Sequence, residues 1–358
     1  MSNIGVFTNP KQELYVGPCE PANAEVELKP SEVLLRVRAT GICGSDVHFW
    51  KEGRVGDTMV VRDEHILGHE SSADVLKVGS AVKNLAVGDR VAIEPGKQCL
   101  TCDQCLHGHY NGCEQVEFKS TPPFQGLLRR LVVHPARLCH KISDRISYEE
   151  GALLEPISVG LAGIRQAELE LGDSVVVCGA GPIGIVCAIL ARAAGAAPLV
   201  ITDINQHRLE MASRLVPNIR TVKVEPNDDP QLTAKKIIAA ANGVKMKVAL
   251  ECTGFEQSIA ASIYSLQFKG VCEIIGVGKD HINLPFMHAS VNEITIRGLF
   301  RYANTWPTAI RLLENKLIDI QGLVTHRLPL EKGVEAFEIA SNPSSNSIKV
   351  IIFNDNIS

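Results

Sequence analysis

Four cysteines stand close together in the segment GKQCLTCDQCLHGHYNGC, with the spacing C-x2-C-x2-C-x7-C. Two-residue gaps let successive sulfur atoms converge on one point, and the longer gap, with Gly108 and Gly112, lets the chain return to complete a tetrahedron. An iron–sulfur cluster also uses C-x2-C-x2-C, but the bacterial run closes after three residues with Cys-Pro, whereas seven residues intervene here and Glu114 follows. The pattern predicts a closed structural zinc site in a lobe over residues 96–114, with the ligands Cys99, Cys102, Cys105 and Cys113.

A second group of residues points to a dinucleotide. Val175 to Cys178 form a short apolar run, and Gly179, Gly181 and Gly184 follow as G-x-G-x-x-G before an alanine-rich helix that runs to residue 195. A second strand, PLVITD, ends at Asp203, 19 residues beyond the last of these glycines. A strand, a glycine turn, a helix and a distal acid in this order predict a Rossmann-type nucleotide site.

Each residue of this pattern has a separate physical role. Gly179 makes the tight turn, Gly181 lets the backbone approach the pyrophosphate, and Gly184 lets helix and strand pack closely, while the helix N-terminus stabilises the anion. A carboxylate at Asp203 accepts hydrogen bonds from the ribose hydroxyls and repels a 2′-phosphate, so we expect NAD rather than NADP. Arg208 leaves the alternative open, since its side chain could face that phosphate or lie over the adenine.

These motifs need two kinds of domain to position them. The alternation of strand and helix continues through MKVALECTG, SIAASIYSLQF and GVCEIIGVG, which extends a doubly wound parallel sheet with helices on its faces. We therefore place a nucleotide domain at residues 155–290. Residues 1–154 contain short β-like stretches such as EVLLRVRATG and GDRVAIEPG, broken by Gly and Pro, and predict a β-rich domain to which residues 291–358 return. The expected fold class is α/β plus β-rich.

Length and composition exclude several classes of protein. A chain of 358 residues exceeds what one core normally organises. Hydrophobic residues make up 45% and charged residues 21%, the net charge is −4, and no block of like charges indicates nucleic acid or a membrane surface as a partner. The N-terminus lacks a basic region followed by an apolar run, and no stretch of about 18 apolar residues occurs. We expect a cytoplasmic protein whose eleven cysteines are thiols or metal ligands rather than disulfides.

A third constellation lies in the β-rich region. Cys43 stands in the glycine-bounded loop GICGSDVHFW, and Gly68 begins the GHE triplet of ILGHESS 25 residues later, which adds His69 and Glu70. Alone, such a cysteine is more often a small core residue and such a histidine a hydrogen-bonded structural one. Together with GAGPIG, its distal acid and the four-cysteine lobe, however, these segments resemble the zinc-dependent medium-chain alcohol and polyol dehydrogenases, from the first residues to IKVIIF.

The resemblance implies a GroES-like catalytic domain, a Rossmann domain, NAD and a catalytic zinc in addition to the structural one. By position, Cys43 and His69 would be zinc ligands. Alcohol dehydrogenases place a cysteine where this chain has Glu155, and Glu155 together with Glu70 is the pattern of the sorbitol and xylitol dehydrogenase branch. Either glutamate could bind the metal while the other holds its water, and Glu155 before Pro156 could alternatively cap a helix. Sulfur, nitrogen and carboxylate donors suit zinc, and three or so protein ligands leave one position open.

The same resemblance implies how the reaction proceeds. Zinc would act as a Lewis acid on the substrate hydroxyl, and a hydride would pass from the same carbon to the nicotinamide. Ser45 would take the released proton and pass it through the cofactor ribose toward His48. Ser45 could alternatively serve only as a turn residue.

A narrower resemblance concerns the substrate. Segments such as IGVFTNP, STPPFQGLLRR and RYANTWPTAIRLLENKLID resemble fungal pentitol dehydrogenases, which implies oxidation of L-arabinitol to L-xylulose. It also implies that Arg301, Tyr302 and Phe118 contact substrate, since an arginine fork supplies several donors to a polyhydroxylated chain. Phe49 joins them, because similar sorbitol dehydrogenases usually have a tyrosine there. The residues implied to contact NAD, besides the glycines and Asp203, are Pro182, Ile183, Arg208, Ile275, Leu299, Phe300 and Arg301.

Two alternatives to this function stay open. The substrate could be D-sorbitol, xylitol or galactitol, or the chain could be a catalytically silent NAD- and zinc-binding protein, because fold alone does not establish function. The family resemblance also implies a homotetramer. The segment EIIGVGKDHINLPF could contribute to it by extending a sheet across an interface.

Overall fold

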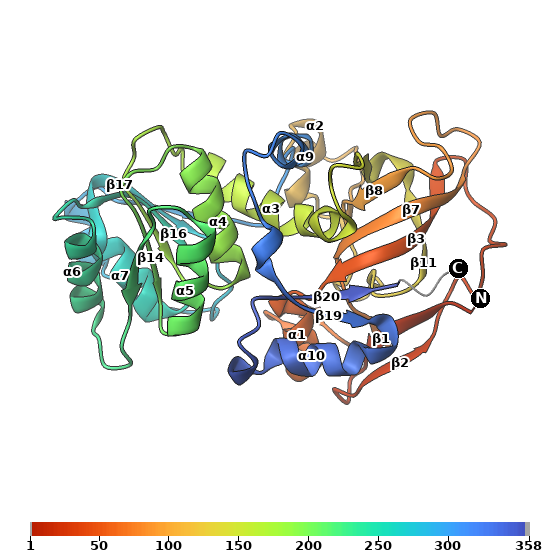
Figure 1. Cartoon of the computed structure of the whole chain (residues 1–358), viewed down its shortest axis with the longest axis horizontal. Helices are drawn as coiled ribbons and strands as arrows, with labels where there is room; N and C mark the ends of the chain where they lie inside the picture. The colour runs from red at the N-terminus through yellow and green to blue at the C-terminus, as the bar shows by residue number, and fades with distance from the viewer. Residues whose placement is uncertain (1, 355–358) are drawn as a thin grey trace. The chain divides into compact units, whose positions relative to one another are not determined.

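A computed structural model describes residues 2–354 of the chain (Figure 1). The described chain divides into two compact units. Unit 1 comprises residues 2–155, 306–315 and 323–354, and unit 2 comprises Pro156–Thr305 and Lys316–Gly322. The expected discontinuous β-rich domain and the inserted nucleotide domain therefore both exist, but the chain returns to unit 1 at Trp306 and not at residue 291.

Unit 1 is built mainly from strands. Its strands are β1 (Ile4–Thr8), β2 (Leu14–Pro18), β3 (Glu32–Gly41), β4 (Arg54–Val55), β5 (Met59–Val60), β6 (His65–Ile66), β7 (Glu70–Val78), β8 (Arg90–Ile93), β9 (Gly96–Lys97), β10 (Glu117–Phe118), β11 (Leu131–Pro135), β12 (Cys139–Lys141), β19 (Val324–Pro329) and β20 (Lys349–Phe353). Its helices are α1 (Gly44–Lys51), α2 (Asp103–Leu106), α9 (Trp306–Glu314) and α10 (Gly333–Ser341), while α3 (Tyr148–Gln166) begins in unit 1 and ends in unit 2.

The largest sheet of unit 1 has seven strands in the order β12-β8-β7-β3-β20-β19, with β11 paired to β3. Strand β3 is long because its sequence, EVLLRVRATG, is rich in β-branched and apolar residues, most of which are buried. It pairs antiparallel with both β7 and β20, so two segments from the first quarter of the chain and one from near its end lie on adjacent strands. A second sheet has the order β2-β1-β6.

Unit 2 alternates strands and helices. Its strands are β13 (Val175–Cys178), β14 (Leu199–Asp203), β15 (Arg220–Lys223), β16 (Met246–Glu251), β17 (Leu266–Ile274) and β18 (Thr295–Gly298). Its helices are α4 (Pro182–Ala193), α5 (Gln206–Leu215), α6 (Pro230–Ala240), α7 (Glu256–Ser265) and α8 (Phe286–Val291).

The six strands of unit 2 form one parallel sheet in the order β15-β14-β13-β16-β17-β18. This is the strand order of a doubly wound dinucleotide-binding fold. Helices α4 and α5 contact each other and so do α6 and α7, and Figure 1 shows the two pairs on opposite faces of the sheet. The sequence predictions of β13, β14 and the helix between them are confirmed, and so is the expected fold class.

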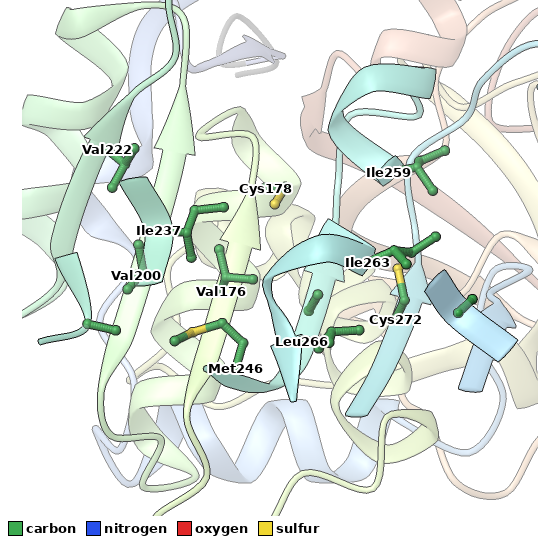
Figure 2. Packing of buried hydrophobic residues seen from close by; sticks show 13 residues of the cluster. Val176, Cys178, Val200, Val222, Ile237, Met246, Ile259, Ile263, Leu266 and Cys272 are labelled. Carbon is green, nitrogen blue, oxygen red and sulfur yellow. The ribbon is translucent and has the colours of Figure 1, made fainter. Parts of the chain in front are cut away.

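The core of unit 2 explains why these segments fold together. A cluster of thirteen buried residues joins strand residues such as Val176, Val200 and Met246 to helix residues such as Ile259 and Ile263 of α7 (Figure 2). Because both faces of a parallel sheet are covered by helices, its strands read as continuous apolar runs such as VVVC, and burial of these runs stabilises the fold.

The end of unit 2 differs from the sequence prediction. Residues 291–305 belong to this unit because β18 pairs with β17 as the sixth strand of the sheet. Strand β17 begins at Leu266, within the stretch expected to be helical, and ends at Ile274. Between Ile274 and β18 the described chain forms no further strand, so the edge of the sheet is β18 and not the segment that follows β17.

All eleven cysteines are free thiols. Among the helices that the structure describes, none combines the length and apolar character required to cross a bilayer.

Candidate metal centre and nucleotide site

Cys43, His69 and Glu70 converge in unit 1. Each offers one ligand atom, and these three atoms all lie within 4.8 Å of one another. Cys43 precedes helix α1 just beyond the end of β3, Glu70 is the first residue of strand β7, and His69 immediately precedes that strand. Pairing of β3 with β7 places Gly41 opposite Glu70 and thereby brings the two segments together. A thiol, an imidazole and a carboxylate at this spacing fit zinc, with a coordination position left open.

Asp46 orients the histidine of this group, a role that the sequence pattern did not reveal. It is fully buried, and its carboxylate accepts hydrogen bonds from the Gly68 N–H (3.0 Å), the Ser120 hydroxyl (2.6 Å) and the Cys43 N–H (3.1 Å). The Nδ1 atom of His69 lies 3.3 Å from its Oδ1 atom, which leaves Nε2 as the nitrogen available to a metal. The feature of the sequence that could have indicated this role is the position of a carboxylate three residues after a candidate cysteine ligand.

The charges of this group perturb one another. Burial raises the pKa of Asp46, but the His69 charge and the hydrogen-bond donors outweigh it and lower the pKa to about 2. Burial lowers the pKa of His69, but the charges of Asp46 and Cys43 outweigh that effect and raise the pKa well above its ordinary value. The negative charges of Asp46 and Cys43 therefore favour a positive charge at this buried site, and a bound metal ion would supply one.

Glu155 occupies a different place from Glu70. It lies in helix α3 and is 5% exposed, but it is not a member of the three-residue group of ligand atoms within 4.8 Å in the described chain. Its charge nevertheless acts on Lys349, which also contacts Glu70. Of the two glutamates, Glu70 is therefore the one grouped with Cys43 and His69, and a direct role of Glu155 at the metal stays a prediction.

Lys349 is the second residue that sequence reasoning missed. Its ammonium group, on the first residue of β20, donates hydrogen bonds to both carboxylate oxygens of Glu70 at 2.8 and 2.7 Å. Burial lowers the pKa of Lys349, but the negative charges of Glu70, Cys43 and Glu155 outweigh it and raise the pKa above its ordinary value. No local motif marks this lysine, because its partner lies 279 residues away in sequence.

The other residues predicted near the metal lie in several environments. Ser45 is half-buried on α1, whereas His48 is exposed and its Nδ1 atom lies 3.0 Å from the Glu52 carboxylate. The Phe118 ring centroid is 5.8 Å from that of His69. Phe49 is 2% exposed and packs in a core cluster with residues such as Leu67 and Phe337. The structure thus places Phe118 beside a candidate ligand, and the roles of the other three stay predictions.

The four cysteines of the lobe also converge. Their sulfur atoms lie within 4.8 Å of one another, and Cys99 Sγ is 3.9 Å from Cys105 Sγ. Backbone N–H groups of Thr101 and Cys102 lower the pKa of Cys99 to about 6, whereas burial and the neighbouring sulfurs raise the pKa of Cys105 to about 12. A bound divalent ion would hold all four as thiolates. The geometry fits the predicted structural zinc site.

The glycine turn of unit 2 has the geometry expected for a pyrophosphate. Gly179 has a φ of +96°, which favours glycine, and a Cβ atom at Gly184 would lie 1.8 Å from the Gly179 carbonyl oxygen. Gly181 precedes helix α4, whose first residues are Pro182 and Ile183. The turn is close-packed where helix and strand meet and open at the helix N-terminus, as binding of an anion there requires.

Asp203 ends strand β14 beside this turn. Its Oδ2 atom accepts a hydrogen bond from the Ala180 N–H at 2.7 Å, and its Oδ1 atom accepts one from the Asn205 N–H, also at 2.7 Å. The carboxylate is thereby held next to the glycine turn. Arg208 lies near the same turn, with Nη1 4.0 Å from the position of a Cβ atom on Gly181. Both residues lie where contact with the cofactor is predicted.

The remaining predicted contacts follow strands β17 and β18. The Leu299 N–H donates to the Ile274 carbonyl at 2.9 Å, and the Ile275 N–H donates to the Glu251 carbonyl at 2.8 Å. Arg301 has a φ of +55°, a strained conformation for this residue type that is common at functional sites. Its guanidinium carbon lies 4.7 Å from the ring centroid of Phe300, which is exposed. Tyr302 is 4% exposed.

Comparison with known proteins identifies the class. Residues 29–144 match the family model of the alcohol dehydrogenase GroES-like domain, and residues 182–315 match that of the zinc-binding dehydrogenases. The chain belongs to the zinc-dependent medium-chain dehydrogenases, in the branch of the polyol dehydrogenases. It is therefore an NAD-dependent oxidoreductase with zinc as its metal, and its substrate is a small molecule.

Individual relatives are similar over nearly the whole chain. L-arabinitol 4-dehydrogenase of Hypocrea jecorina is 54% identical over 354 residues, which cover 98% of this chain and 93% of that protein. Sorbitol dehydrogenase of Bos taurus is 46% identical over 323 residues, covering 90% and 89%. Among solved structures, 2R,3R-butanediol dehydrogenase from Bacillus subtilis has a TM-score of 0.86 and 27% identity, and the match covers 99% of this chain and 100% of that one.

Proposed function

We propose that this chain oxidises L-arabinitol to L-xylulose and reduces NAD in the same reaction. The observation that carries the proposal is the convergence of Cys43, His69 and Glu70 in a chain 54% identical to an L-arabinitol 4-dehydrogenase. D-sorbitol, xylitol and galactitol are the competing substrates, and the 46% identity to a sorbitol dehydrogenase favours D-sorbitol among them.

The proposed site assigns a role to each group of residues. Zinc, when bound, supplies a Lewis acid that lowers the pKa of a hydroxyl group. Cys43, His69 and Glu70 would hold it, and Glu155 would hold a water or exchange with Glu70. Ser45 would accept the proton that leaves the substrate hydroxyl and pass it toward His48.

Substrate and cofactor contacts complete the proposal. Arg301 would donate to substrate hydroxyls with its planar guanidinium, and Phe49, Phe118 and Tyr302 would contact the substrate. Asp203 would accept hydrogen bonds from the adenosine ribose. The residues proposed to contact NAD in addition are Gly179, Gly181, Pro182, Ile183, Gly184, Arg208, Ile275, Leu299, Phe300 and Arg301.

Steady-state kinetics with four polyols tests this function. We expect kcat/KM with NAD to be highest for L-arabinitol, followed through the absorbance of the reduced cofactor. A higher value for D-sorbitol, xylitol or galactitol would replace the proposed substrate. Absence of turnover with every polyol, in protein that binds both NAD and zinc, would support the catalytically silent alternative.

We also propose a homotetramer in the cytoplasm. Strand β18 leaves an edge of the unit 2 sheet without a further strand in the described chain, and large apolar side chains nearby in sequence are exposed. These are Val277, Phe286, Met287, Val291 and Ile296. Burial of such side chains between subunits would stabilise an assembly. Light scattering coupled to gel filtration would give the mass, and a monomer would contradict the proposal.

The cysteines support the proposed location in the cytoplasm. All eleven are free thiols, as expected of a protein in a reducing compartment.

A further inference from the structure

Lys349 uses all of its hydrogen-bonding capacity inside the protein. The side chain is 4% exposed, and Nζ donates to both carboxylate oxygens of Glu70, at 2.8 and 2.7 Å, and to the Ile42 carbonyl at 3.1 Å. An ammonium group has three N–H donors, so this set is complete. Ile42 precedes the candidate ligand Cys43, and Glu70 follows the candidate ligand His69. One side chain therefore joins the two segments that carry the ligands.

The sheet forces this arrangement. Strand β20 begins at Lys349 and pairs antiparallel with β3, whose residue Gly41 faces Ile351. The same Gly41 faces Glu70 of β7 across the other edge of β3. A further hydrogen bond, from the Ile42 N–H to the Val350 carbonyl at 3.0 Å, closes the junction. The ends of three strands thus meet at the ammonium group.

The Glu70 carboxylate is confined on its other side as well. It is 1% exposed, and a Cβ atom on Gly41 would lie only 2.1 Å from its Oε2 atom. Each carboxylate oxygen has two lone-pair directions, and Lys349 takes one on each. A direction on each oxygen is left over for a metal. The lysine and a metal can therefore share this carboxylate.

The charge balance of the site makes the lysine more than a packing residue. Cys43, Asp46, Glu70 and Glu155 are acidic groups in or beside this site, and Lys349 is a buried cation on which three of them act. A buried carboxylate without its cation is costly, because water no longer solvates it. Without Lys349, Glu70 would have to rotate, take up a proton or admit water, and each of these changes weakens a positioned ligand.

We propose that Lys349 is a positioning residue that holds the Glu70 carboxylate beside Cys43 and His69 and thereby sets the zinc affinity of this site. The inference rests on the metal site that the proposed function assigns. It predicts that an uncharged side chain at position 349 weakens zinc binding through Glu70 and through no other residue.

The test is zinc binding by Lys349→Met, Glu70→Gln and the double variant, measured by competition with a chelator and by metal content. Loss of a residue that orients a metal ligand commonly reduces affinity 10- to 100-fold, and we expect that loss for Lys349→Met. The double variant should bind zinc as Glu70→Gln does, because Lys349 then has no carboxylate to position. The zinc of the four-cysteine lobe should stay bound in every variant and serves as an internal reference.

Lys141→Met is a matched control in the same unit, because this lysine pairs with Asp89 at the surface at 2.6 Å. Its zinc affinity should equal that of the unmodified protein. Unchanged affinity in Lys349→Met, or a double variant that binds more weakly than Glu70→Gln, overturns the inference. If Lys349→Met does not fold, the zinc affinities of the charge-balanced double variant and of Glu70→Gln are compared, and this comparison tests the inference by itself. Unmodified protein that binds only the lobe zinc would instead refute the proposed metal site.

Discussion

Two buried glutamates on adjacent strands of unit 2 should respond to neutralisation with opposite signs. Glu273 of β17 and Glu251 of β16 are both fully buried. Glu251 accepts hydrogen bonds from the Gly254 N–H (2.8 Å), the Thr253 N–H (3.0 Å) and the Ser258 hydroxyl (2.8 Å). Within the described structure, neither carboxylate oxygen of Glu273 has a hydrogen-bond partner. A buried charge without hydrogen-bond partners is destabilising, so Glu273→Gln should stabilise the protein.

The magnitude follows from the pKa of Glu273. Burial raises this pKa from 4.5 to about 7, although the charge of Arg297 offsets part of the increase. The folded state holds the proton of Glu273 more tightly than the unfolded state does. The unfavourable contribution of this residue to the free energy of unfolding is therefore absent below about pH 4.5 and grows until about pH 7. At about 1.4 kcal/mol per pKa unit, the difference between 4.5 and about 7 corresponds to about 3 kcal/mol. Glu273→Gln should gain up to about that free energy of unfolding near pH 8 and almost none near pH 4.5.

Urea denaturation followed by circular dichroism, at about pH 5 and about pH 8, measures both effects. Glu251→Gln is the matched control and should lose about 1–3 kcal/mol at both pH values, because it leaves buried donors without a charged acceptor. A Glu273→Gln variant that is less stable at about pH 8, or equally changed at both pH values, would refute the reasoning. Either result would mean that Glu273 has a partner in the folded protein.

Three further predictions concern the site. Asp46→Asn should lower zinc affinity 10- to 100-fold in chelator competition, because it weakens the acceptor that orients His69; unchanged affinity would contradict this. Asp203→Ser should lower the preference for NAD over NADP by about tenfold or more, in line with about 1.5–3 kcal/mol for a charged hydrogen bond, and kcat/KM with each cofactor measures it. Phe49→Tyr should shift substrate preference from L-arabinitol toward D-sorbitol or xylitol, because the tyrosine adds a hydrogen-bond donor. The ratio of kcat/KM values for these polyols measures the shift, and equal ratios in the variant and the unmodified protein would contradict the prediction.

The features that the sequence predicted well are those with short-range causes. Residues 175–203 carry the strand, the glycine turn, the helix and Asp203 in one continuous segment, so the requirements of an anion site are visible as spacing. The four cysteines of the lobe are local in the same sense, since 14 residues separate the first from the last. Resemblance to a family added Cys43, His69 and Glu70, whose spacing alone did not distinguish them from core residues.

Other features depended on contacts between distant segments. The limit of unit 2 lay beyond the expected residue 290, because β18 reads as an ordinary exposed strand until its pairing with β17 is known. Asp46 was visible in its motif, but its role became clear only when Gly68, His69 and Ser120 were found around it.

By itself, the sequence determined the class of the four-cysteine lobe and of the nucleotide site, because their ligand atoms and glycine turn lie close together in the chain and are constrained by local geometry. Only the tertiary structure decided which charges share the metal centre. Lys349 and Glu70 are 279 residues apart, and they meet because β20 and β7 both pair with β3. Strands that are distant in the sequence pair with one another, and no local sequence pattern identifies the partners. Because the ion pair that results is buried, the loss of one of its charges is strongly destabilising.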